Sequence, residues 1–173
     1  MALLFPKYYF RYRFAIDNWN DELLNLSQQY WKKRKFKCEQ TDLTQIKGKR
    51  GGLWGNFTSF DMKKMLCDLS VKVDANNFVD CQLEIDSIGQ SFTEWNIMDF
   101  ELELIFFQNA LLGIKKPEYM HEYIKYRKNA NIFWSFSLGL LGSRLSTNLK
   151  EKLTILTEEV VMIKKLRRRH LQT

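Results

Sequence analysis

The sequence is poor in the residues that mark disordered, fibrous, disulfide-bonded or metal-binding chains. Its 173 residues include only 2 prolines and 8 glycines, too few for a collagen-like or low-complexity chain. Its 3 cysteines, Cys38, Cys67 and Cys81, show none of the spacings of a zinc site, so we expect reduced, buried thiols. The sequence predicts no metal and no cofactor.

Long apolar segments are missing as well. No apolar run reaches the roughly 18–20 residues of a membrane span. The apolar run between Met1 and Lys7 is too short for a secretory signal. We therefore expect a cytoplasmic protein, either free or peripheral on a membrane.

Histidine is scarce, which bears on catalysis. The chain has 2 histidines, His121 on a predicted helix surface and His170 near the end of the sequence. Neither has a carboxylate that the sequence can assign to orient it, and no Ser or Cys lies in a nucleophile-elbow pattern. The sequence thus predicts a non-catalytic protein.

Charge is abundant, and it is segregated along the chain. Residues 1–50 carry 11 basic and 5 acidic side chains, residues 51–113 carry 3 and 10, and residues 114–173 carry 13 and 5. An acidic middle between two basic ends favours internal charge pairing. The excess of +7 could attract nucleic acid, anionic lipid or an acidic protein surface.

Strict alternation of apolar and polar residues predicts the sheet. Aromatic residues occupy every second position from Tyr8 to Phe14, as in a half-buried strand. The same alternation on both sides of residues 74–77 predicts an antiparallel hairpin. If its turn is centred on Asn76, Lys72 faces Asp80.

Helical periodicity predicts the rest of the fold. Apolar spacing indicates helices over residues 18–34, 94–112 and about 147–169. The second is apolar on more than half of its circumference, so the segment after Pro117 is expected to cover its outer side. We predict an α+β fold, with an antiparallel sheet of about four or five strands covered by two helices. Residues 1–113 form this domain, and residues 114–173 form a helical extension that is apolar in the middle and basic at its end.

Three motifs between residues 50 and 94 carry a resemblance to a known family. They are Arg50-Gly51, Gly55-Asn56-Phe57-Thr58-Ser59-Phe60-Asp61 and Gly89-Gln90-Ser91-Phe92-Thr93. With the hairpin between them, they resemble a family of uncharacterised small α+β proteins of cyanobacteria. The resemblance implies an α+β domain, and because no activity is known for that family, it implies none here.

Two polar clusters admit a binding site or a purely structural interpretation. Asp80, Glu84 and Asp86 share one predicted strand face, but without calcium-loop spacing a solvated sheet face is the favoured interpretation. Basic residues precede the glycines at 51, 52 and 55, where a backbone anion nest could form. This stretch matches no phosphate-loop motif, and we favour a structural turn that buries Trp54 and Phe57.

The preferred function is a binding or assembly module that docks on a larger protein complex, at a membrane surface in one version. The apolar segment 132–142 either covers the outer side of the helix over residues 94–112 or is exposed. If it is exposed, it would form with the basic end of the chain a two-part docking surface of apolar insertion and electrostatic attraction. Its residues are Phe133, Trp134, Phe136, Leu138, Leu140, Leu141, Lys164, Lys165, Arg167, Arg168 and Arg169.

Two alternatives remain open at this point. The first is nucleic-acid binding through interleaved basic and aromatic residues, which requires one shared face for Arg11, Arg13, Lys32, Lys33, Arg34, Lys35 and Lys37. The second is a carrier of a small hydrophobic ligand, which requires a cavity between the sheet and the helix over residues 94–112.

Overall fold

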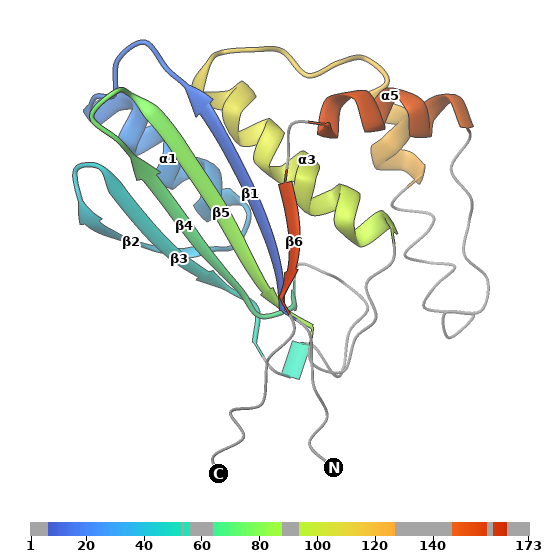
Figure 1. Ribbon diagram of the computed structural model, residues 1–173, viewed down its shortest axis with the longest axis horizontal. Coiled ribbons are helices and arrows are strands. Elements are labelled where there is room, and N and C mark those ends of the chain that lie inside the picture. Colours follow the sequence, from blue (N-terminus) through green and yellow to red (C-terminus); the bar gives the residue numbers. More distant parts are fainter. Residues whose placement is uncertain are drawn as a thin grey trace.

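The computed structural model describes residues 7–52, 54–55, 64–87, 94–126, 147–158 and 161–165. One antiparallel sheet of six strands runs through the molecule in the spatial order β2-β3-β4-β5-β1-β6 (Figure 1). Two helices pack on one of its faces, and the predicted α+β class is confirmed. The strands are β1 (Lys7–Ala15), β2 (Lys37–Asp42), β3 (Gln45–Arg50), β4 (Cys67–Val73), β5 (Phe78–Asp86) and β6 (Val161–Lys165), and the two helices are α1 (Asp21–Lys33) and α3 (Glu94–Leu111).

The β4–β5 hairpin has the predicted register. Lys72 pairs with Asp80 and Asp68 with Glu84 across the two strands. The carboxylate of Asp74 accepts hydrogen bonds from the backbone N–H groups of Asn76 and Phe78, and Asn77 adopts the left-handed φ of 57°. These local contacts close the turn and hold the register.

Helix α1 begins and ends with ordinary capping chemistry. The side chain of Asn20 accepts a hydrogen bond from the Leu23 N–H at 3.0 Å. Acidic Asp21 and Glu22 lie in the first turn, and Lys32 and Lys33 lie in the last. Both placements suit the helix dipole, so the excess of basic charge gathers where α1 ends.

The main core fills the space between the sheet and the two helices. Phe10 and Phe100 stack with ring centroids 5.3 Å apart, and Phe107 of α3 meets both Tyr30 and Trp31 of α1. Cys67 and Cys81 are buried in the same core, as predicted, whereas Cys38 is only half-buried at its border. This aromatic packing argues against a ligand cavity between the sheet and α3, which the carrier hypothesis requires.

A second, smaller core covers the outer side of α3. Met98 and Leu102 of α3 pack against Met120 and Tyr123, from the helical residues 120–126, and against Leu149 and Leu153 of α5 (Thr147–Thr157). Figure 1 shows this layer on the side of α3 away from the sheet. Helix α3 is apolar on more than half of its circumference because the sheet buries one side and this second layer buries the other, as the sequence predicts. The division at residues 113 and 114 stays a prediction.

The C-terminal helix is shorter than predicted. It ends at Thr157, and the chain then forms β6, which pairs antiparallel with β1 from Lys7↔Lys165 to Arg11↔Val161. The β-branched residues Val161 and Ile163 favour a strand. Pairing with β6 also supplies hydrogen-bond partners for the backbone groups on the second edge of β1. Helical periodicity in the sequence cannot reveal this stabilisation.

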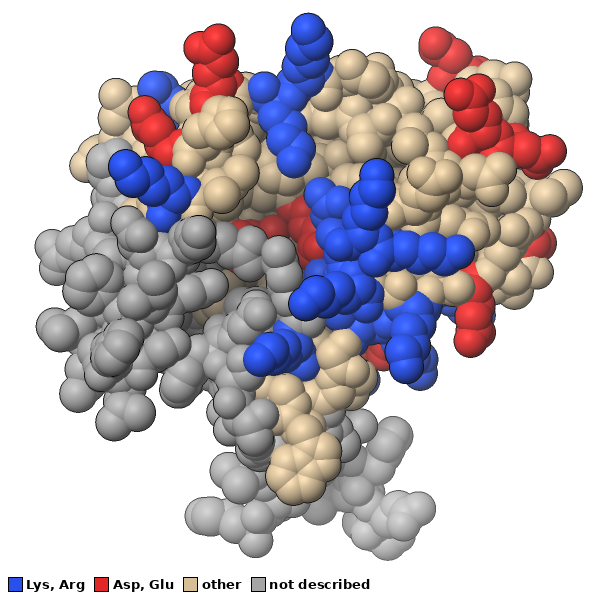
Figure 2. Space-filling model, turned by 180° about the vertical axis from the view of Figure 1, so that it is seen from behind, with Lys and Arg blue, Asp and Glu red and all other residues tan. Residues whose placement is uncertain are grey.

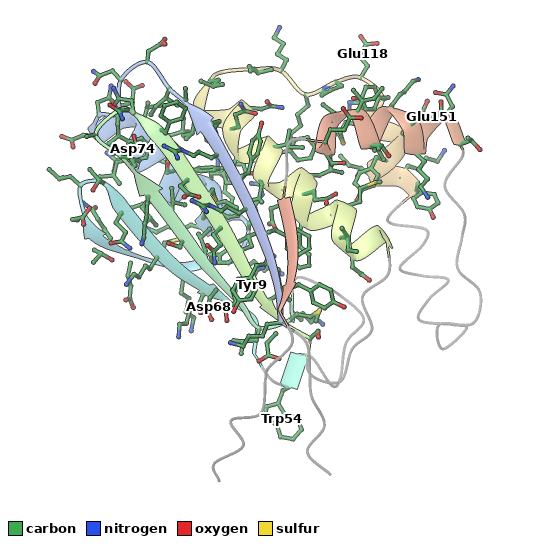
Figure 3. All side chains as sticks on the ribbon, in the orientation of Figure 1. Tyr9, Trp54, Asp68, Asp74, Glu118 and Glu151 are labelled. Carbon is green, nitrogen blue, oxygen red and sulfur yellow. The ribbon has the colours of Figure 1, made fainter. Side chains whose placement is uncertain are left out.

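The glycine-rich turn is structural, but it does not bury Trp54. Gly51 has a φ of +72°, and a Cβ there would lie 2.0 Å from the Met65 carbonyl oxygen. A Cβ at Gly55 would lie 1.9 Å from the Lys64 carbonyl oxygen. Trp54 is 81% exposed and extends beyond the ends of the strands (Figure 3). The predicted burial of Trp54 is wrong, because backbone contact rather than aromatic packing holds this turn. Phe57 lies outside the described residues.

Substituting Gly51 tests this explanation. We expect Gly51→Ala to lower the free energy of unfolding by at least about 2 kcal/mol, because an L-residue is strained at this φ and the methyl group meets backbone atoms. Gly52→Ala is the matched control, since nothing lies within 4 Å of its Cβ position. Urea unfolding of both variants is the measurement, and equal losses for the two would contradict the explanation.

None of the helices in the described part of the chain has the length and apolar character needed to cross a membrane.

Candidate functional site

The face of the sheet turned away from α1 and α3 is a network of ion pairs. Arg11 donates through Nε and Nη2 to Asp80, and Arg13 donates to Asp74 at 2.6 Å while its guanidinium lies 4.6 Å from the Phe78 ring centroid. Lys7 pairs with Glu84 and Lys49 with Asp68. Strand β1 thus pairs its charges with the acidic β4–β5 hairpin, as the charge segregation predicts. Figure 3 shows Asp74 at the turn of that hairpin and Asp68 toward its other end.

The residues of the predicted nucleic-acid surface do not share one face. Arg11 and Arg13 lie on the open face of the sheet, where both already hold carboxylates. Lys37 begins β2 opposite Lys49, and both line a depression of that open face. The four remaining basic residues, Lys32, Lys33, Arg34 and Lys35, follow one another at the end of α1, on the other side of the sheet.

Most of the predicted docking residues lie outside the described part of the chain. This applies to Phe133, Trp134, Phe136, Leu138, Leu140, Leu141, Arg167, Arg168 and Arg169. Lys164 and Lys165 are the last residues of β6, at register positions opposite Tyr8 and Lys7. Their role in docking stays a prediction.

A pocket of about 380 Å³ opens on the helix side, where α1, α3 and the segment 116–124 meet. Figure 2 shows Lys and Arg side chains gathered on this side around a hollow in which acidic atoms are visible. Its walls combine apolar and charged groups from four separate stretches of chain. The lining residues are Lys33, Arg34, Arg50, Asp99, Phe100, Leu102, Glu103, Phe106, Lys116, Tyr123 and Ile124.

A buried ion pair forms the inner wall of this pocket. Arg50, whose side chain is 1% exposed, donates to both carboxylate oxygens of Glu103 at 2.7 and 2.9 Å. Its guanidinium also lies 4.3 Å from the Phe36 ring centroid and donates to the Arg34 carbonyl oxygen at 3.3 Å. The pair therefore ties β3, the end of α1 and α3 together. Arg50 is a packing residue, and it does not face the solvent as a phosphate nest would require.

The outer wall of the pocket carries cations at close quarters. The guanidinium of Arg34 lies 3.4 Å from the Tyr30 ring centroid, and its Nε is 3.6 Å from Glu103. The ammonium of Lys116 lies 4.8 Å from the Phe106 ring centroid. Partial burial, and secondarily the positive charge of Arg34, hold the pKa of Lys116 below its usual value. Adding an anion at this rim would relieve that repulsion.

This pocket does not follow from the sequence pattern, which assigns Arg34 to a nucleic-acid surface and Arg50 to a glycine-rich turn. Lys116 and Glu103 belong to no motif. One signal was available, because Asp99, Glu101 and Glu103 lie on a helix that is apolar on more than half of its circumference. A carboxylate in such a position is expected to have a cationic partner.

The described histidine and the cysteines lie outside the lining of this pocket. His121 is exposed on the helical segment 120–126, and His170 lies outside the described residues. Burial raises the pKa of the thiols of Cys67 and Cys81, which keeps both protonated and unreactive. Within the described ranges, no three His, Cys, Asp or Glu side chains come together as a metal site would need.

Comparison with protein-family models, with curated proteins and with solved structures finds no match for this chain. The resemblance to small cyanobacterial proteins stays a prediction.

Proposed function

We propose that this chain is a non-catalytic binding module that docks on a larger protein assembly through the basic side of the molecule. This basic face consists of Lys32, Lys33, Lys35, Lys115 and Lys116, together with Arg34. The observation that supports the proposal is the difference in charge compensation between the two sides of the sheet. On the open face, Lys7, Arg11, Arg13 and Lys49 each hold a carboxylate. Lys47 and Lys72 lie opposite Glu39 and Asp80 in the strand register, and Lys37, opposite Lys49, is the exception. The five lysines of the basic face pair with no carboxylate among the described residues.

Apolar side chains next to these lysines favour a protein partner over nucleic acid. Leu112 is 42% exposed, Ile114 is 52% exposed and Ile124 is 54% exposed. Ile124 lines the same pocket as Lys116, Ile114 directly precedes Lys115, and Leu112 lies two residues before Ile114. Protein interfaces combine an apolar centre with a charged rim, while the phosphate backbone of a nucleic acid is recognised mainly by cations. We therefore expect an acidic protein surface with apolar side chains at its centre.

Charge reversal tests this proposal with a matched control. The test variant carries Lys32→Glu, Lys35→Glu and Lys115→Glu, and the control carries Lys37→Glu, Lys47→Glu and Lys72→Glu on the open face. All six lysines are exposed, so both triples change the charge equally at exposed positions. We expect a stoichiometric partner, purified with the tagged chain from its own cells, to stay with the control and to be lost from the test variant.

The same purification separates the competing functions. Soluble and solubilised-membrane fractions are analysed apart, with and without nuclease. Material released by nuclease would overturn the proposal in favour of the nucleic-acid alternative. Equal loss of the partner from both triples, or no stoichiometric partner in either fraction, would also overturn it.

The predicted apolar docking residues need point substitutions in place of truncation. Deleting residues 132–173 would remove β6 and leave one edge of β1 unpaired, so a lost partner could reflect a damaged sheet. Replacing Phe133, Trp134 and Phe136 by serine keeps β6. We expect this variant to lose the partner while its thermal unfolding temperature stays unchanged, and full retention of the partner would remove these residues from the docking surface.

A further inference from the structure

We propose that the pocket between α1, α3 and the segment 116–124 binds a phosphate monoester carried on an aromatic or other apolar body. The inference concerns a small ligand and does not depend on the docking function. It rests on the charge balance of the pocket, on two groups already held in position, and on the apolar part of its walls.

The pocket holds more positive than negative charge. Four cations, Lys33, Arg34, Arg50 and Lys116, line it together with two carboxylates, Asp99 and Glu103. Arg50 and Glu103 neutralise each other in a bidentate pair. A phosphate monoester carries about −1.5 to −2 charges at neutral pH, which matches the remaining surplus.

Arg34 is held in place before any ligand arrives. Its guanidinium packs on the Tyr30 ring, and its Nη1 donates to the Tyr30 carbonyl oxygen at 3.3 Å. A guanidinium has five N–H donors, so donors remain for phosphate oxygens. Preorganised charged donors of this kind lower the entropy cost of binding.

The second positioned group is the pair of Tyr123 and Asp99. The hydroxyl of Tyr123 donates to the Asp99 carboxylate at 2.5 Å, which fixes both side chains beside the cations. A bound phosphate would therefore contact the rim formed by Lys33, Arg34 and Lys116 and keep its distance from the carboxylates.

The walls beside the cations are apolar. Phe100, Leu102, Phe106 and Ile124 contribute to the lining, and a volume of about 380 Å³ lies within the range of small-molecule sites. An inorganic anion would leave these walls in contact with water. An aromatic or aliphatic group on the phosphate would bury them and gain hydrophobic stabilisation.

Ligand titration followed by amide chemical shifts tests the site on the full chain. The probes are phenyl phosphate, inorganic phosphate and phenol. We expect saturable shifts for phenyl phosphate at residues lining the pocket, and at least tenfold weaker binding of the other two probes. Inorganic phosphate binding as tightly as phenyl phosphate, or shifts spread evenly over the lysines of both faces, would overturn the proposal.

Substitutions at the rim provide the matched comparison. Lys116→Met keeps an unbranched stem over Phe106 and removes the charge, and we expect it to weaken phenyl phosphate about tenfold. Lys72→Met removes an exposed lysine of the open face and is expected to leave the affinity unchanged. Neither change should shift the thermal unfolding temperature, so a lost affinity reports on the site. Equal effects of the two substitutions would overturn the proposal.

Vesicles identify the source of the phosphate group. Phosphatidylcholine vesicles that contain phosphatidic acid present a phosphate monoester in a membrane, and vesicles of phosphatidylcholine alone, a phosphodiester, are the control. Binding to phosphatidic acid that falls with Lys116→Met would support a lipid ligand for the pocket, and binding of phenyl phosphate alone would support a soluble ester. Failure of all phosphate probes would overturn the site and leave the docking function, which is measured by partner capture, unaffected.

Discussion

Replacing Phe107 by alanine is expected to lower the free energy of unfolding by about 3–5 kcal/mol, the usual range for a large aromatic residue removed from a core. The Phe107 side chain is fully buried. Its ring lies 6.0 Å from that of Phe14 and close to 5 Å from those of Tyr30 and Trp31. The substitution therefore leaves a cavity where β1, α1 and α3 meet, in an interior that is close-packed.

Equilibrium unfolding in urea measures this loss as a lower transition midpoint with an unchanged slope. Ile155→Ala serves as the control because Ile155 is 69% exposed on α5, and we expect its effect to stay within about 0.5 kcal/mol. A loss below about 1 kcal/mol for Phe107→Ala would mean that this aromatic cluster is not the centre of the core.

Removing Glu103 is the second change with a large expected effect. Glu103→Ala leaves the guanidinium of Arg50 buried without its carboxylate, which costs about 3–5 kcal/mol of unfolding free energy. The comparison variant is Asp68→Ala, which breaks the exposed pair with Lys49. Exposed pairs contribute about 0–1 kcal/mol, so urea unfolding should separate the two variants clearly.

Replacing both Arg50 and Glu103 tests whether the loss of stability comes from an unpaired buried charge or from lost packing. The variant with Arg50→Met and Glu103→Leu removes the uncompensated charge, and we expect it to recover most of the stability lost in Glu103→Ala. Recovery is favoured because Nε of Arg50 is buried without a hydrogen-bond acceptor among the described residues, so the wild-type pair is not fully satisfied. A double variant as unstable as Glu103→Ala would show that the pair is indispensable for packing.

The parts of the fold that follow from local pattern were predictable. Alternation in β1 and in the hairpin assigns each side chain to a face, and the turn at residues 74–77 then determines which residues oppose each other. The pairing of Lys72 with Asp80 follows from these two facts alone. The covering of α3 on two sides was equally predictable, because an apolar circumference has to be buried.

The elements that depend on distant partners were not predictable. Residues 161–165 have a helix-compatible spacing, and they form a strand because the free edge of β1 is available in the folded chain. Trp54 is exposed because the turn that carries it is held by the backbone contacts of Gly51 and Gly55. Hydropathy alone assigns a tryptophan to the core.

The candidate pocket could not be predicted from the sequence for the same reason. Its cations come from the end of α1, from β3 and from the segment after α3, and only folding brings Arg34, Arg50 and Lys116 together around Glu103. The spacing of these residues along the sequence does not indicate that they lie close together in the fold. The carboxylates on the largely apolar helix α3 were the one available indication. They show that a cationic partner is needed, but they do not identify it.

The position of β1 has a consequence for how the protein is made. This strand is synthesised before the other five, yet its two neighbours in the sheet are β5 and β6. A nascent chain therefore leaves both edges of β1 unpaired until residues 78–86 have left the ribosome, and the aromatic side of β1 lacks its cover until α3 follows. One strand edge then stays open until residues 161–165 follow. Such edges are prone to intermolecular pairing. If translation stops shortly before β6, the released chain has a nearly complete core but an unpaired edge on β1. Such a chain is a natural substrate for chaperones.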